Sequence, residues 1–135
     1  MTDVFGNYVL QKLLEYGNPD QCESLAVLLS GQAVQLSMQM YGCRVVQKAL
    51  EYVGTQRLIA IVSEFESPPV LLRCVHDSNG NHVIQKCIEI VSRVAKEAAT
   101  PELSEYLSGR IQFVIDAFQV QQRTARSRPV ATHVI

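Results

Sequence analysis

The sequence predicts an all-α protein, a right-handed α-solenoid built from stacked three-helix units. Aromatic residues make up only 7% of the 135 residues, and the chain has no Trp, 7 Gly and 5 Pro, which disfavours an all-β sandwich with frequent tight turns. A ten-residue segment recurs three times at a spacing that is typical of stacked helical repeats. The apolar residues of each copy follow the spacing of one helix face, which makes helix the repeated element.

The repeated segment begins at Gly6, Gly42 and Gly80. The copies read GNYVLQKLLE, GCRVVQKALE and GNHVIQKCIE, and they start 36 and then 38 residues apart. Apolar residues stand three, four, seven and eight positions after each Gly, which indicates an amphipathic helix. We call these elements the motif helices and expect each to begin near its Gly, after turn-like residues that include the capping groups of Asp3 and Asp77.

Between consecutive motif helices the chain has room for two shorter helices, which gives three helices per unit. Ser, Gly and Pro residues break each interval in the middle, at 30–31 and 67–69. After the third motif, Thr100 and Pro101 provide an N-cap and a first helical residue for a further helix. The expected short helices span 21–29, 33–40, 55–65 and 70–76, and helix is also expected to continue over 92–99.

These units divide the chain into a partial repeat domain over 1–118 and a polar tail over 119–135, where we expect irregular structure. An echo of the motif at 131–135 is too weak to nominate a fourth site. The domain comprises a half unit (1–17), two units (about 18–53 and about 54–91) and an incomplete unit (about 92–118).

Composition and motif content exclude several classes of function. Twelve Lys and Arg against 13 Asp and Glu give a net charge of -1, which provides no global attraction for nucleic acid, and the apolar runs are too short to cross a bilayer. Four cysteines without a C-x-x-C pair, and no secretory signal, predict free thiols in the cytoplasm. No catalytic motif is present, so we expect no enzyme. We expect no metal or cofactor either, because Cys74, His76, His82 and Cys87 lack the spacing of a zinc site.

Each motif helix carries a polar fork and a flat side chain beside it. The residue after the Gly and the recurrent Gln are four positions apart, so they return to nearly the same face of the helix. A pair of hydrogen-bonding groups and a planar platform in every unit match what a splayed single-stranded base requires, which is edge hydrogen bonds and face stacking. The forks are Asn7 with Gln11, Cys43 with Gln47 and Asn81 with Gln85, and the flat residues are Tyr8, Arg44 and His82.

These motif helices resemble those of the Pumilio (PUF) family of RNA-binding proteins, over about Asp3 to Phe118. The resemblance implies that Asn7–Gln11 and Asn81–Gln85 read uracil and that Cys43–Gln47 reads adenine. Because the family binds RNA antiparallel to the protein, it implies the preference U, A, U within a longer element. It also implies binding to mRNA 3′ untranslated regions for translational repression or decay, with regulatory proteins on the outer face.

The sequence departs from the family pattern. A full family domain has eight repeats between capping ends, whereas this sequence contains a half unit, two units and an incomplete unit. Base stacking contributes about 1 to 3 kcal/mol per base, so three sites alone predict feeble RNA binding. Lys12, Lys48 and Lys86 are candidate phosphate contacts, although a Lys on an exposed helix face is usually only solvated. The alternative function is a helical-repeat scaffold that binds protein.

Overall fold

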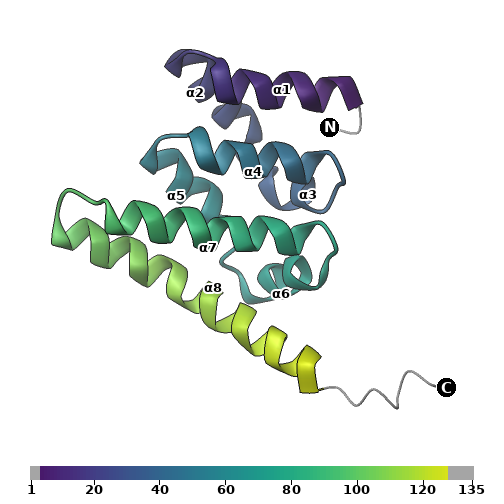
Figure 1. The fold of residues 1–135 in the computed structure, drawn as a ribbon, viewed down its shortest axis with the longest axis vertical. Coiled ribbons are helices and arrows are strands. Elements are labelled where there is room, and N and C mark those ends of the chain that lie inside the picture. The colour runs from purple at the N-terminus through teal and green to yellow at the C-terminus, as the bar shows by residue number, and fades with distance from the viewer. Residues whose placement is uncertain (1–3, 128–135) are drawn as a thin grey trace.

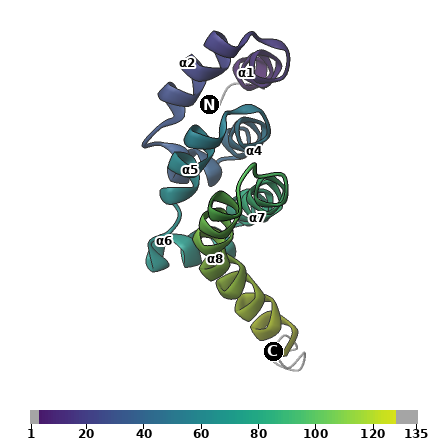
Figure 2. The ribbon, with the colours of Figure 1, turned by 90° about the vertical axis from the view of Figure 1, so that its left-hand side faces the viewer.

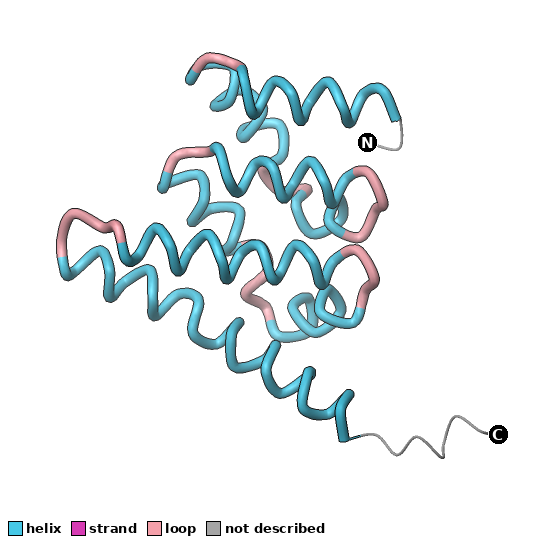
Figure 3. The backbone as a smooth tube through the Cα atoms, viewed as in Figure 1, coloured by secondary structure: helices cyan, strands magenta, loops and turns pink. Residues whose placement is uncertain are grey.

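The computed structural model describes residues 4–127, and helices joined by short loops take up nearly all of this range (Figure 3). No helix of this part of the chain is both long and apolar enough for a transmembrane span. The eight helices of the described residues are α1 (Val4–Tyr16), α2 (Pro19–Leu29), α3 (Ala33–Ser37), α4 (Gly42–Tyr52), α5 (Thr55–Ser63), α6 (Pro68–His76), α7 (Gly80–Lys96) and α8 (Pro101–Ser127).

The three motif helices are α1, α4 and α7, and they lie side by side in one layer (Figure 1). In the view turned by 90°, the three motif helices are seen nearly along their axes and lie one below the other. Helices α2, α5 and α6 lie on the opposite side of the stack (Figure 2). Helix α4 contacts both α1 and α7, and α8 packs along α7. The predicted solenoid of stacked helical units is therefore confirmed.

The core forms from the apolar stripe that the repeat predicts. In α4, Val45, Val46, Ala49 and Leu50 are each at most 1% exposed. The equivalent positions of α7 are also buried apart from Ile88, which is partly buried. Removing a Val or Leu side chain from water contributes about 1.5–3 kcal/mol, so this stripe holds α4 and α7 against their neighbours. In α1 only Leu14 of the stripe is buried, and Val9 is 54% exposed.

Two helix starts, those of α7 and α8, follow the capping signals of the sequence. The Asp77 carboxylate accepts hydrogen bonds from the backbone N–H of Asn79 (2.9 Å) and Gly80 (2.8 Å), which turns the chain into α7. The Thr100 hydroxyl accepts one from Leu103 N–H (3.2 Å) at the start of α8. Asp3 lies outside the described residues. Asp77 and Thr100 act as the capping residues that the sequence predicted.

The glycines that open α4 and α7 are required by close packing. A Cβ at Gly80 would stand 2.7 Å from the carbonyl oxygen of Cys74, and a Cβ at Gly42 would collide with the Leu36 carbonyl in the same way. We call α3 and α6, which precede α4 and α7, the lead-in helices. Each lead-in helix thus packs directly against the first turn of its motif helix. This contact explains why Gly recurs at the start of these two copies.

The largest departure from the sequence prediction is at the C-terminal end. Helix α8 continues to Ser127, so the irregular structure expected over 119–135 is wrong for residues 119–127. Leu107, Ile111 and Val114 of α8 are buried in the core, and the Gln, Arg and Ala residues that follow are good helix formers. Residues 128–135, including the weak echo at 131–135, lie outside the described range. In addition, α3 ends at Ser37, α5 at Ser63 and α7 at Lys96, earlier than expected. Helices α2 and α6 begin two residues before the expected starts at 21 and 70, because Pro19 and Pro68 occupy the first helical position, where Pro is favoured.

Candidate nucleic-acid interface

Each motif helix presents a polar face that its core-forming stripe leaves uncovered. In α4, Arg44 is exposed and Gln47, Lys48 and Glu51 are half-buried, at positions two, five, six and nine after Gly42. Such spacing places the four side chains on one side of a helix. We call this the polar face. Its members are Tyr8, Gln11, Lys12 and Glu15 in α1, Arg44, Gln47, Lys48 and Glu51 in α4, and His82, Gln85, Lys86 and Glu89 in α7.

The first member of each predicted fork lies at the edge of the polar face, closer to the core than the sequence suggested. Asn7 and Cys43 are each only 5% exposed, while Asn81 is half-buried. All three nevertheless take equivalent positions, because each side chain donates a hydrogen bond to the carbonyl oxygen three residues earlier. The distances are 2.7 Å from Asn7 to Val4, 3.2 Å from Cys43 Sγ to Met40 and 3.0 Å from Asn81 to Ser78.

The recurrent Gln meets the first member of the fork where that member is Asn. Gln11 Nε2 donates to Asn7 Oδ1 (2.6 Å), and Gln85 Nε2 donates to Asn81 Oδ1 (2.9 Å). Among the described residues, the Gln47 side chain has no such bond to Cys43. The four-residue spacing therefore brings the two amides together in α1 and α7. Each Gln keeps its carbonyl oxygen and a second amide proton for a further partner.

The three flat side chains are accessible to solvent. Tyr8 is 60% exposed, and Arg44 and His82 are exposed as well. The Lys12 ammonium lies 5.4 Å from the centre of the Tyr8 ring, and the Arg44 guanidinium lies 6.0 Å from that of Tyr41. Cation–π contacts of this kind stabilise the orientation of exposed aromatic rings. All three residues are placed where a planar ligand could reach them.

The lysines of the polar face are engaged with carboxylates. Lys48 Nζ lies 3.5 Å from Glu15, and Lys86 Nζ lies 2.8 Å from Glu51, so each pair joins neighbouring motif helices. The hydrogen bond that the Lys86 ammonium donates to the Glu51 carboxylate raises the pKa of Lys86. Sequence reasoning nominated these lysines for phosphate and overlooked the Glu residues. The constant Glu at position nine of every copy was the available signal.

A shallow depression runs across the polar faces of all three motif helices. Its lining joins side chains that are far apart in the sequence and that include predicted base readers of two units. The lining residues are Gln11, Arg44, Gln47, Lys48, Glu51 and Lys86. The fold thus brings polar, planar and charged groups from α1, α4 and α7 onto one continuous surface.

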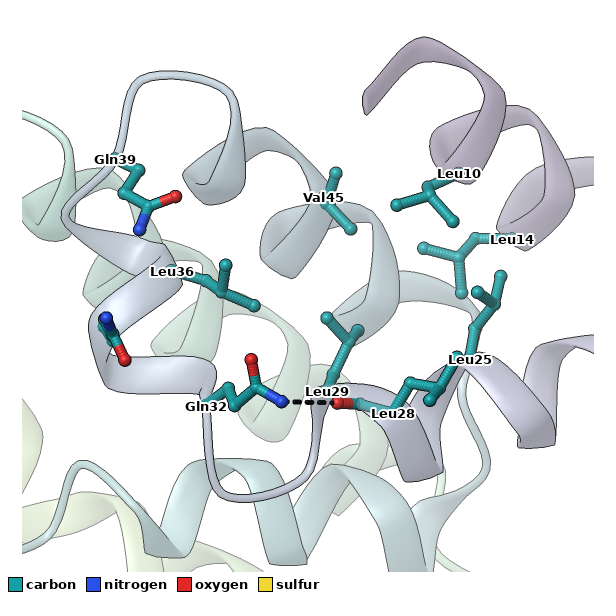
Figure 4. A pocket seen from close by; sticks show the side chains of 10 residues that line it. Leu10, Leu14, Leu25, Leu28, Leu29, Gln32, Leu36, Gln39 and Val45 are labelled. Atoms are coloured by element: carbon teal, nitrogen blue, oxygen red, sulfur yellow. Dashed lines mark hydrogen bonds between the residues drawn. The ribbon is translucent and has the colours of Figure 1, made fainter. Parts of the chain in front are cut away.

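A second, apolar hollow lies between α1, α2, α3 and α4 (Figure 4). Leucine side chains such as Leu10, Leu25 and Leu28 face it, and Gln32 Nε2 donates to the Leu28 carbonyl at its edge (3.3 Å). The hollow therefore lies between helices of the first two units, and most of its lining is leucine.

The cysteines do not assemble a metal site. All four are free thiols, and within residues 4–127 no cluster of three or more His, Cys, Asp or Glu side chains could hold a metal ion. Burial raises the pKa of the Cys87 thiol to about 12 and also raises that of Cys74. Because metals bind the thiolate, these two buried thiols are poor ligands.

Comparison with known proteins agrees with this geometry. The model of the Pumilio-family RNA binding repeat matches residues 1–28, 32–65 and 75–98. The chain belongs to the Pumilio family of RNA-binding repeat proteins. Pumilio-family proteins are RNA-binding regulators and not enzymes, in agreement with the expectation from the motif content of the sequence.

Curated relatives and solved structures add detail. The putative chloroplastic pumilio homolog 8 of Arabidopsis thaliana is 39% identical over 95 residues, which are 68% of this chain and 18% of the relative. Pumilio homolog 1 of Xenopus laevis is 55% identical over 53 residues, 39% of this chain and 4% of the relative. The Puf3 RNA binding domain bound to a Cox17 RNA 3′ UTR recognition sequence is 44% identical with a TM-score of 0.64, covering 83% of this chain and 30% of that one. The chain therefore spans less than a fifth of these two curated relatives.

Proposed function

We propose that the chain binds single-stranded RNA sequence-specifically, with one base per motif helix. The observation that carries this proposal is the equivalence of three adjacent helices, each with the same polar set on the same face. Solved relatives bound to RNA, including the Puf3 domain on its 3′ UTR recognition sequence, support it. The chemistry of the polar face suits bases, because amide groups offer both donors and acceptors to a base edge.

The forks divide into two kinds. In α1 and α7 a hydrogen-bonded Asn–Gln pair offers both a donor and an acceptor to a base edge, which suits uracil. In α4 the Cys43 thiol stands in place of the Asn, so Gln47 meets the base with a smaller, less polar neighbour, which suits adenine. Because RNA runs antiparallel to the chain in this family, α7, α4 and α1 read 5′-U-A-U-3′. Tyr8, Arg44 and His82 stack between the bases.

The proposed target is the 3′ untranslated region of mRNA in the cytoplasm, with repression or decay as the outcome. The RNA-bound relatives support this assignment, since several are in complex with 3′ UTR recognition sequences. The outer side of the stack, formed by α2, α5 and α6, would be free to bind regulatory proteins while RNA occupies the polar face.

A panel of short RNAs tests the proposal on the chain itself. Fluorescence anisotropy would compare fluorescein-labelled RNAs of about nine nucleotides that hold U-N-U in the middle, with N as each of the four bases. We expect adenine to bind more tightly than the other three bases. Arg44→Ala should weaken all four RNAs, because it removes a stacking platform worth about 1–3 kcal/mol. Equal affinity for the four RNAs would contradict the reader roles. Because three sites predict feeble affinity, the titration would extend to about millimolar concentration, and binding of none of the RNAs even there would favour the protein-scaffold alternative.

A further inference from the structure

Two ion pairs cross from one motif helix to the next at the same place in each unit. Glu15 of α1 meets Lys48 of α4, and Glu51 of α4 meets Lys86 of α7. In both pairs the Glu stands at position nine of its motif and the Lys at position six of the following one. We call these two pairs the ladder. Nothing in the amphipathic pattern of a single helix requires such pairing between units.

The ladder lies beside the proposed base readers. Lys48, Glu51 and Lys86 line the same depression as Gln11 and Gln47. The side chains of Lys48, Lys86, Glu15 and Glu51 retain only 20–30% of their exposure, so solvent screens them less than a fully exposed pair. These ion pairs therefore connect neighbouring motif helices next to the proposed base readers.

The ladder also leaves the polar face with balanced charge. Every motif helix contributes one Lys and one Glu, and each of the lysines has a carboxylate within 4 Å. A phosphate would have to compete with Glu15 for Lys48 and with Glu51 for Lys86. Such a surface attracts RNA weakly by charge and relies on base contacts.

We infer that Lys48 and Lys86 are positioning residues that fix the spacing between neighbouring base readers, and that they are not phosphate ligands. The inference rests on the proposed function. Hydrogen bonds to a base weaken steeply outside a narrow range of distance and angle. A sideways or lengthwise shift of α7 against α4 would move Gln85 relative to Gln47 and spoil simultaneous binding of two bases. The ladder opposes that shift from the surface, where the aliphatic core does not reach.

Removing a carboxylate separates the two roles, because they predict opposite signs. Glu51→Gln breaks the link between α4 and α7, and we expect it to weaken binding of the U-A-U RNA about twofold to fivefold, the range of a partly exposed ion pair. A phosphate role for Lys86 predicts tighter binding instead, since the competing carboxylate is gone. Glu23→Gln is the matched control: it removes an equal charge from an ion pair between units, with Arg57 (2.6 Å), that joins α2 to α5 outside the polar face. We expect no weakening from it.

Two more variants complete the test. Lys86→Arg should retain the affinity of the parent, because Arg also pairs with a carboxylate. Lys86→Gln should leave the dependence of log affinity on log salt unchanged, whereas loss of a phosphate contact would lower that slope by about 0.7. Tighter binding by Glu51→Gln, or a reduced slope in Lys86→Gln, overturns the inference.

A measurement without RNA keeps this inference distinct from the proposed function. Thermal unfolding of the parent, Glu51→Gln, Lys86→Gln and the double variant gives the coupling of the pair by a double-mutant cycle. We expect a favourable coupling, and a coupling of zero overturns the ladder. A parent that binds none of the RNAs contradicts the proposed function. The double-mutant cycle then still tests whether Glu51 and Lys86 stabilise the stack, because it uses no RNA.

Discussion

At the scale of single residues, neighbouring positions of a motif helix have opposite environments. Cys43 is buried and Arg44 is exposed, although both were expected to face RNA. The sequence predicted which residues belong to the polar side, because helical spacing fixes their direction. It could not predict how far the adjoining units would cover the position after the Gly, since that depends on how closely the helices pack.

Cys43→Asn should convert the preference at the middle base from adenine to uracil. The thiol already donates to the carbonyl oxygen three residues earlier, as Asn81 does, so an Asn fits the same bond and can accept from Gln47 as Asn7 accepts from Gln11. Anisotropy with the U-N-U panel would measure the change, with Glu23→Gln as a control that retains the preference for adenine. Persistence of the adenine preference in Cys43→Asn would refute the assignment of this residue.

Cys87 makes stability depend on pH in the alkaline range. Burial raises the pKa of its thiol from 9.0 to about 12, so above pH 9 the unfolded chain loses a proton that the folded chain keeps. The free energy of unfolding should therefore fall as pH rises from 9 to 10, by up to about 1.4 kcal/mol per pH unit from this thiol. Urea unfolding at these pH values would measure it. Cys87→Ala should flatten the dependence, and an equally steep slope in that variant would exclude Cys87 as its source.

At the scale of elements, repeated sequence translated directly into repeated structure. The three motif helices, the capping residue Asp77 and the start of α8 at Pro101 all follow from local signals. The ladder did not follow, because pairing Glu51 with Lys86 requires the sideways register of two helices. The polar composition after residue 118 predicts irregular structure, but a helix that is already packed against the core continues through good helix formers, and α8 therefore extends to Ser127.

Gly80→Ala should destabilise the fold by about 1–3 kcal/mol, the usual cost of overpacking. The added Cβ would lie 2.7 Å from a backbone oxygen of the lead-in helix, and backbone cannot move aside as a flexible side chain does. Gly109→Ala in α8 is the matched control, because a Cβ there meets nothing within 4 Å and Ala favours helix. Thermal unfolding should show a lower midpoint for Gly80→Ala and an unchanged or higher one for Gly109→Ala. Equal midpoints for the two variants would contradict the packing argument.

At the scale of the whole molecule, stacking of the motif helices combines the polar groups of single helices into one continuous surface. One Asn–Gln pair is an ordinary contact within a helix. Because the three motif helices lie in one layer (Figure 2), equivalent positions of the three helices lie side by side. The net charge of -1 and the paired lysines give this surface no strong attraction for phosphate, so its selectivity must come from bases.

Selection of RNAs from a random pool by the 135-residue chain tests the central claim most directly. Because three stacked bases give modest affinity, the chain would be immobilised at high density and the bound RNAs sequenced after each round. The account predicts enrichment of a contiguous 5′-U-A-U-3′ core over the starting pool. Enrichment of no common sequence, or of a core without uracil on both sides of adenine, would contradict it.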